Sequence, residues 1–227
     1  MAPTPFAAFN RGANARYQIT GVDSQSFGVL SNSTQRPDGA MTVLNTTVLS
    51  GSTSVKEIGG DANHATGRWA AGTVTTASGA TTLTGTDNRS YHYIAFNVPT
   101  VFPASGTLAC DAGAFTAPTY TGGGTVRSAS NTGTATGSAS LSFGAAGATV
   151  GGSINVAANG SSGSALLTGS IAAPNLSSTT GAYFSNGSGV YTQIGSADAG
   201  AYLVASSFAV VLADGSRYIG VARFRCN

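Results

Sequence analysis

Residues 202–224 read YLVASSFAVVLADGSRYIGVARF, and this stretch decides the fold. Two apolar runs, Tyr202–Ala213 and Arg217–Phe224, flank the pair Asp214-Gly215. An Asp-Gly pair between two apolar runs is the strongest local signal for a β-hairpin, because a type I′ turn needs positive φ at both of its central positions. We therefore expect two antiparallel strands at this end of the chain.

Short strand-like runs recur through the rest of the chain, each bounded by Gly, Asn or Asp, at the spacing typical of an antiparallel meander. Gly144-Ala145-Ala146-Gly147 joins two of them and would place the apolar residues of both on one face, namely Leu141, Phe143, Val150, Ile154 and Val156. No stretch has clear helical periodicity, although Val55–Ala65 could carry one helical turn. The runs are Thr42–Leu49, Arg68–Ala77, Tyr91–Val98, Gly106–Ala112, Gly137–Phe143, Thr149–Ala157, Ser164–Ile171 and, in broken form, Tyr183–Ile194.

The composition points to the same class. Of 227 residues 32 are glycine, and there is one lysine, Lys56, and one glutamate, Glu57. The outer face of a surface helix needs long charged side chains, whereas a β-sheet can expose Ser, Thr and other small residues. We predict an all-β protein with a single antiparallel β-barrel of about eight strands over residues 41–227, because closure hides sheet edges. A β-sandwich is the alternative. Residues 1–40 would form an extended N-terminal strap with one strand at Arg16–Val22.

Cys110 and Cys226 are the two cysteines. An even count in a charge-poor β protein predicts one disulfide formed in an oxidising compartment, with two separate buried thiols as the alternative. A disulfide would hold the last strand in place and close a loop of about half the chain. The chain-entropy relation gives a stabilisation of the folded state of about 4 kcal/mol for a loop of this length.

The candidate ligand-binding residues are aromatic. In Tyr91-His92-Tyr93-Ile94-Ala95-Phe96, strand alternation places Tyr91, Tyr93 and Ala95 on one face and His92, Ile94 and Phe96 on the other. This segment, with Trp69, could bind haem or an aromatic ligand. The competing interpretation, which we favour, is that one face is core and the other is barrel surface. We expect no cofactor.

Other polar groups carry no clear chemistry. A single glutamate excludes paired-glutamate catalysis, and His64 and His92 have no metal-ligand spacing around them. Asp61, Asp87 and Asp198 could bind calcium, but we interpret them as turn-capping residues. Arg217, Arg223 and Arg225, close together near the C-terminus, read as a solvated rim and not as an anion site. A net charge of +2 does not indicate a nucleic-acid partner.

Several motifs follow one another in a familiar order. They are Gly67-Arg68-Trp69, Ser90-Tyr91-His92-Tyr93, Pro103-Ala104-Ser105-Gly106-Thr107 and Ser140-Leu141-Ser142-Phe143-Gly144. Over roughly residues 60–172 the chain resembles the C-terminal β-barrel of bacterial FecR-domain-containing surface proteins. That barrel is similar to those of transferrin-binding-protein-B-like and Slam-dependent surface lipoproteins. The resemblance implies a small antiparallel barrel outside the cell with loops as the binding element, and it implies no catalytic residues.

We therefore expect a non-enzymatic β-barrel at the extracellular or outer-membrane surface of a bacterium, which binds a protein or small-molecule partner through its loops. Segments 121–138 and 158–163 are the expected binding loops. The alternative is a structural subunit of a filament, coat or appendage that self-associates by N-terminal strand exchange. We expect no membrane-spanning segment, since no apolar run is long enough for a helix and Gly133–Ser142 exposes small residues where a lipid-facing barrel needs large ones.

Overall fold

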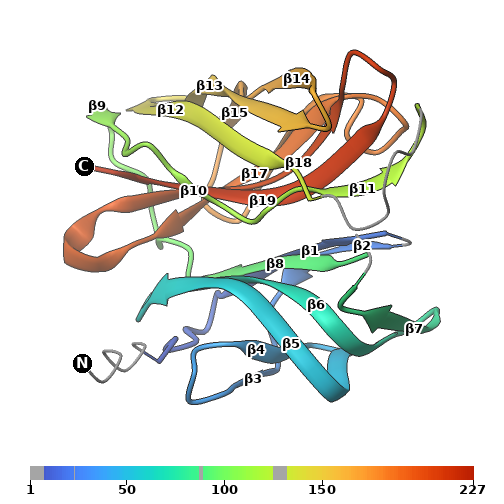
Figure 1. The fold of residues 1–227 in the computed structure, drawn as a ribbon. Helices are drawn as coiled ribbons and strands as arrows, with labels where there is room; N and C mark the ends of the chain where they lie inside the picture. The colour runs from blue at the N-terminus through green and yellow to red at the C-terminus, as the bar shows by residue number, and fades with distance from the viewer. Residues whose placement is uncertain (1–7, 23, 87–88, 125–131) are drawn as a thin grey trace, which may run out of the picture.

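The computed structural model describes residues 8–22, 24–86, 89–124 and 132–227. In these ranges the strands pair antiparallel throughout, and the one helical element is a 3₁₀ turn at Asp198–Gly200. None of the described segments is a helix of the length and apolarity needed to cross a bilayer. The predicted all-β antiparallel class is confirmed, and its strands form three sheets (Figure 1).

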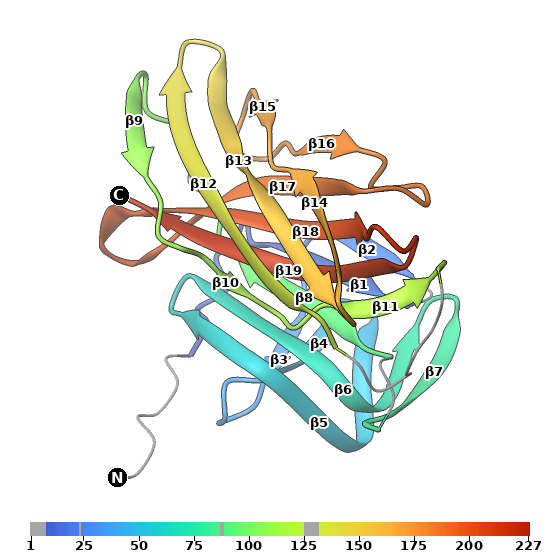
Figure 2. The same ribbon diagram turned by 45° about the horizontal axis from the view of Figure 1, so that its top comes forward.

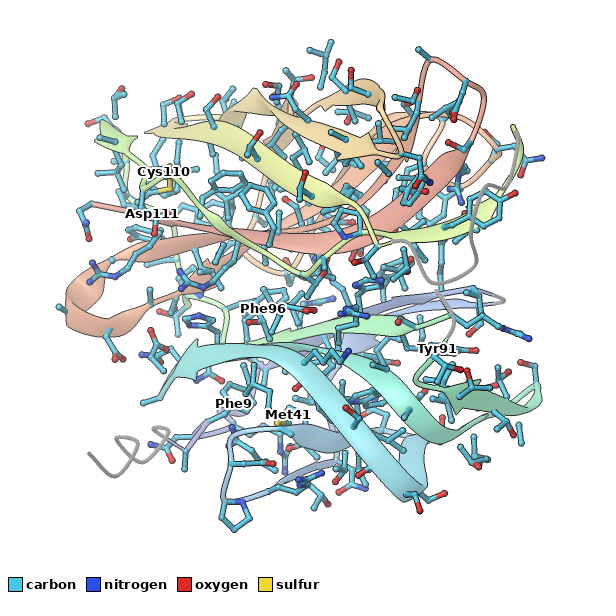
Figure 3. All side chains as sticks on the ribbon, viewed as in Figure 1. Phe9, Met41, Tyr91, Phe96, Cys110 and Asp111 are labelled. Atoms are coloured by element: carbon cyan, nitrogen blue, oxygen red, sulfur yellow. A yellow bond between two sulfur atoms is a disulfide. The ribbon has the colours of Figure 1, made fainter. Side chains whose placement is uncertain are left out.

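The first sheet curls into a half-barrel. Its concave side encloses a core of its own, which includes Trp69, Tyr91 and Tyr93; Phe9 and Met41 lie on the lower side of this core in Figure 3. In spatial order its strands are β2 (Gln25–Val29), β1 (Arg16–Gly21), β8 (Tyr91–Phe96), β6 (His64–Thr76), β5 (Thr47–Asp61), β4 (Met41–Leu44) and β3 (Ser33–Gln35), and β7 (Gly79–Thr84) also pairs with β6.

The other two sheets pack face to face above the half-barrel (Figures 1 and 2). The central sheet consists of β10 (Ala114–Phe115), β19 (Arg217–Cys226), β18 (Tyr202–Val211), β17 (Gly189–Ser196) and β16 (Ser178–Gly181), with β11 (Thr119–Gly122) paired to β19. The outer sheet consists of β14 (Ser161–Leu166), β13 (Gly147–Ala158), β12 (Thr134–Gly144) and β9 (Gly106–Ala109), with β15 (Gly169–Ile171) paired to β13.

Strand β18 shows that the central sheet is buried on both of its faces. Val204, Phe208 and Val210 contact the outer sheet's core, whereas Leu203 and Ala205 contact residues of the half-barrel. Because side chains alternate between the two faces of a strand, a strand that is buried on both faces must be apolar almost throughout. This explains the nearly unbroken apolar run Tyr202–Ala213.

The two predicted hairpins form. Gly144 pairs with Gly147 across a two-residue turn, and Leu141, Phe143, Val150, Ile154 and Val156 all lie in one core, as predicted. Strands β18 and β19 also pair, but the predicted type I′ turn is wrong: of its two central residues only Gly215 has positive φ. The reason is a longer turn, in which the Gly215 amide donates to the Leu212 carbonyl and the Asp214 carboxylate accepts from Ser216.

Two segments differ from the prediction. In the predicted strap, β1 forms as expected, but residues 25–35 add the two short strands β2 and β3 to the first sheet. The division at residue 40 stays a prediction. The helical turn expected within Val55–Ala65 is wrong, since β5 runs through Asp61. Three register shifts interrupt the pairing of β5 with β6, and these bulges remove the alternation by which a strand is recognised.

Cys110 and Cys226 form a disulfide, with an S–S distance of 1.99 Å across 116 residues of sequence (Figure 3). The predicted bridge is confirmed and the alternative of two free thiols is excluded. The bond lies between the segment after β9 and the end of β19, so it links the outer sheet to the central sheet. A disulfide is compatible with an extracellular location.

Candidate functional site

Trp69, Tyr91 and Tyr93, predicted as ligand-binding residues, all lie within the core of the half-barrel and are at most 1% exposed. The Trp69 Nε1 donates to the Met41 carbonyl at 2.7 Å, and the Met41 amide donates to the Tyr93 hydroxyl at 3.0 Å. Burial raises the pKa of Tyr93. These contacts tie β4 to β6 and β8 across the half-barrel, which is a structural role.

His92 projects from the other face of β8, as alternation predicts, into the buried layer between the first and central sheets, which we call the seam. Its Nδ1 and Nε2 lie 2.7 Å from the hydroxyls of Thr116 and Thr119. Burial, reinforced by the nearby Arg68 charge, lowers the pKa of His92 well below its usual value. The four predicted residues therefore divide between two buried environments, and His92 is fully enclosed.

The seam contains buried polar contacts beside an apolar cluster that includes Ile94, Leu203 and Ala205. Arg68 forms a two-pronged ion pair with Glu57, at 2.6 and 2.8 Å, and Gln18 donates to Gln193 and to the Ala205 carbonyl. The ion pair lies within the first sheet, whereas the Gln18 contacts cross to the central sheet and hold the two layers in one register. Protein contacts occupy much of the seam, and hollows remain where it opens, including one of about 290 Å³ lined by Glu57, Thr66 and Arg223.

Arg217 lies at one such opening. It begins β19 and shares the hollows there with residues from the end of β11, from the connection between β16 and β17, and from the two ends of the β1–β2 connection. Two hollows, of about 430 and 360 Å³, adjoin here and share Arg217 and Asn186 as lining residues. We call them together the Arg217 groove. Its other lining residues are Gly21, Val22, Ser24, Gln25, Thr121, Gly122, Gly123, Tyr183, Phe184, Ser185 and Gly215.

The Arg217 guanidinium is half-buried and only weakly satisfied. Nε donates to the Gly187 carbonyl at 3.5 Å, Nη1 to the Thr121 hydroxyl at 3.4 Å and Nη2 to the Tyr183 carbonyl at 3.2 Å. Two of these distances exceed the usual range for hydrogen bonds, and the three contacts leave two of the five arginine N–H groups without an acceptor among the described residues.

No carboxylate among the described residues forms an ion pair with Arg217. Burial lowers the pKa of Arg217, while the Tyr183 phenol acts in the opposite direction. The guanidinium remains charged at neutral pH, because arginine titrates far above it. The groove therefore contains a partly desolvated cation to which the described residues supply dipoles but no countercharge, and this arrangement favours an anionic ligand.

An aromatic wall stands beside this cation. Phe184 is 62% exposed, yet its ring packs edge-on against Tyr183, Phe27 and Tyr191 at centroid distances of 5.1, 6.0 and 6.0 Å. Tyr183 lies buried beneath it, and burial raises the pKa of Tyr183 to about 12. Three supporting rings thus hold one exposed ring in place, so the groove offers a fixed apolar surface next to its charge.

The residue pattern alone did not indicate this site. The interpretation of the C-terminal arginines as a solvated rim is wrong for Arg217, which is half-buried, and for Arg223, whose Nε is buried. Of the expected binding loops, 121–138 contributes Thr121–Gly123 to the groove, and 125–131 lies outside the described residues. The expected loop at 158–163 is a short turn in which Asn159 and Gly160 both have positive φ.

Two of the three carboxylates that were considered as calcium ligands lie in the described residues, and both accept hydrogen bonds from the protein. Asp61 accepts from the backbone amides of Asn63 and His64, and Asp198 accepts from the Asn63 side chain. Asp87 lies outside the described residues. Across the described ranges no three metal-ligating side chains come together.

The chain was compared with models of protein families, with curated proteins and with solved structures, and none of the three comparisons gives a match.

Proposed function

We propose that this is a non-enzymatic binding protein of the bacterial cell surface or extracellular space, and that the Arg217 groove binds a carboxylate-bearing ligand. The observation that carries the proposal is the half-buried guanidinium with two free N–H groups and no acidic partner among the described residues. A single fixed positive charge matches a singly charged carboxylate, which a guanidinium can bind in a two-pronged geometry.

The chemistry of the groove suits binding better than catalysis. A guanidinium holds an anion but does not exchange protons near neutral pH, so it cannot serve as a general acid or base there. The exposed Phe184 ring and the Asn186 amide would fix the orientation of a ligand held at Arg217. The extracellular location is supported by the disulfide and by the resemblance to bacterial surface barrels.

Strand exchange in a filament or coat, the alternative function, depends on the N-terminal segment, of which residues 1–7 lie outside the described residues. No described contact favours it over ligand binding.

The test is isothermal titration of the purified protein with small carboxylates that carry a ring, such as galacturonate and benzoate. We expect binding that Arg217→Gln weakens about tenfold to a hundredfold, the usual contribution of hydrogen bonds to a charged group. Arg36→Gln is the matched control, because Arg36 pairs with Asp38 far from the groove. Equal binding by wild type and Arg217→Gln, or an equal loss in both variants, would contradict the proposal.

A further inference from the structure

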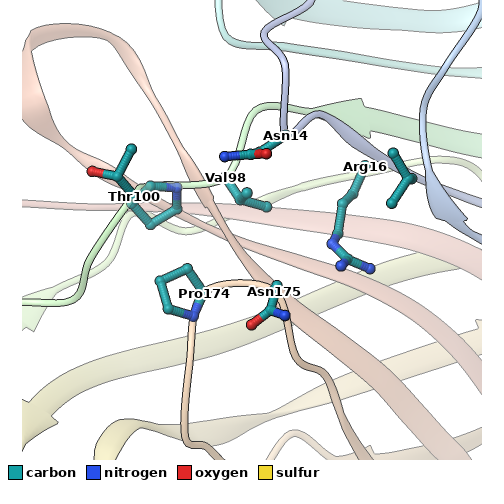
Figure 4. A pocket seen from close by; sticks show the side chains of 8 residues that line it. Asn14, Arg16, Val98, Thr100, Pro174 and Asn175 are labelled. Carbon is teal, nitrogen blue, oxygen red and sulfur yellow. The ribbon is translucent and has the colours of Figure 1, made fainter.

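A second arginine lines a hollow at the other end of strands β1 and β2 from the Arg217 groove. Arg16 lies at the start of β1, and its side chain points into a space of about 310 Å³ that Asn175 enters from the other side (Figure 4). Asn14, Val29 and Thr100 also line this space, which we call the Arg16 hollow. Across the described ranges Arg16 makes no side-chain hydrogen bond and no ion pair.

The register of β1 and β2 shows that the two openings belong to one face. Gln18 points into the seam, so Arg16 and Thr20 project on the same side of β1. Their partners on β2 are Val29 opposite Arg16 and Gln25 opposite Thr20. Val29 lines the Arg16 hollow and Gln25 lines the Arg217 groove, so the hollows lie about 13 Å apart along this ribbon, at the usual rise per residue.

Aromatic rings fill the interval between the two hollows. Phe27, which pairs with Gln18 midway along β2, packs against Tyr191 at a centroid distance of 4.3 Å, and both side chains are partly exposed. Phe184 continues this row toward Arg217. The rim of the seam thus presents two cations at its ends, one from each sheet, joined by an aromatic strip.

We propose, on the basis of the function proposed above, that the Arg16 hollow is a second anion subsite and that an acidic oligosaccharide lies along the rim with one carboxylate at each arginine. The neutral lining groups favour a saccharide, because Asn14, Asn175 and Asn186 each offer donors and acceptors to hydroxyl groups. An aromatic strip suits the apolar faces of sugar rings. An acidic peptide added to the free edge of β2 is the competing ligand, and the experiment includes it.

The experiment compares galacturonate, long oligogalacturonate, polyglutamate and a neutral oligosaccharide in titrations of wild type, Arg16→Gln, Arg217→Gln and Arg36→Gln. Two linked subsites raise the apparent affinity through effective concentration, so we expect long oligogalacturonate to bind about a hundredfold more tightly than the monomer. Arg16→Gln should remove this gain while leaving monomer binding at Arg217 intact. Arg36→Gln should keep the gain, which separates site binding from general attraction to positive charge.

The outcomes separate this inference from the proposed function. In one outcome the monomer binds and its binding depends on Arg217, but long oligomers bind no more tightly than the monomer, or their higher affinity survives Arg16→Gln. That outcome refutes the second subsite and leaves the proposed function standing. If neither the monomer nor the oligomer depends on Arg217, both fail. Tighter binding of polyglutamate than of oligogalacturonate, or equal binding of a neutral oligosaccharide, refutes the assignment of an acidic saccharide.

Discussion

Mild acid should destabilise the folded protein through His92. The ring is fully buried between Thr116 and Thr119, and burial holds its pKa well below the usual 6.5. Below pH 6.5 the unfolded chain therefore binds a proton at this residue that the folded chain does not bind, so the free energy of unfolding falls as the pH falls. This contribution is fully present above the unfolded pKa and is lost progressively on acidification.

The magnitude follows from the linkage relation. One histidine that stays neutral in the folded state costs about 2 kcal/mol between about pH 7.5 and about pH 5, because the slope approaches about 1.4 kcal/mol per pH unit below the unfolded pKa. His64 should add to this loss, since burial lowers its pKa too, although Asp61 at 2.9 Å partly opposes the shift.

Urea denaturation at the two pH values measures the effect. Trp69, the single tryptophan, is fully buried, so its fluorescence reports unfolding. We expect wild type to lose at least about 2 kcal/mol on acidification and His92→Gln to lose about 2 kcal/mol less than wild type. The comparison uses only the change in the free energy of unfolding between the two pH values, so the absolute stability of the variant does not affect it. An unchanged pH dependence in His92→Gln would refute the reasoning.

Three further substitutions test the main structural contacts. Cys110→Ala with Cys226→Ala should lower the free energy of unfolding by about 4–5 kcal/mol, from the 116-residue separation, in chemical denaturation; no difference between oxidised and reduced wild type would argue against this. Glu57→Gln should cost about 1–3 kcal/mol in thermal denaturation, less than a fully buried pair, because Glu57 is 29% exposed; a stabilised variant would contradict it. Trp69→Phe should cost about 1–3 kcal/mol by circular dichroism, because the Met41 carbonyl loses its donor, and no loss would show that this bond is dispensable.

The sequence predicted those parts of the fold in which residue pattern and environment agree. Strands β12 and β13 alternate cleanly because one face meets the core and the other meets solvent, and their predicted face is the buried one. The two faces of β8 were also assigned correctly. The pattern could not show that both faces of β8 are buried, because an exposed and a buried tyrosine or histidine look the same in sequence.

The Arg217 groove could not be found from sequence for a different reason. Its walls come from four parts of the chain that are distant in sequence and meet only through the stacking of the sheets, namely residues 21, 22, 24 and 25, residues 121–123, residues 183–186, and residues 215 and 217. The property that makes Arg217 a candidate binding group also depends on its surroundings. A guanidinium can bind an anion when it is partly desolvated and no carboxylate lies close to it. Neither condition is visible in the identity of residue 217 or of its neighbours in the chain.

Arg217 should contribute little to the stability of the fold, and a stability measurement therefore separates a role in binding from a structural role. A half-buried cation held by neutral oxygens at 3.2–3.5 Å gains little from its contacts and has lost part of its hydration. A neutral side chain at this position avoids the cost of desolvating a charge. Arg217→Gln should therefore change the free energy of unfolding by less than about 0.5 kcal/mol or raise it, while weakening carboxylate binding. Urea denaturation without ligand provides the measurement, and a loss above about 2 kcal/mol would mean that Arg217 serves the fold and that the missing countercharge is no sign of a ligand.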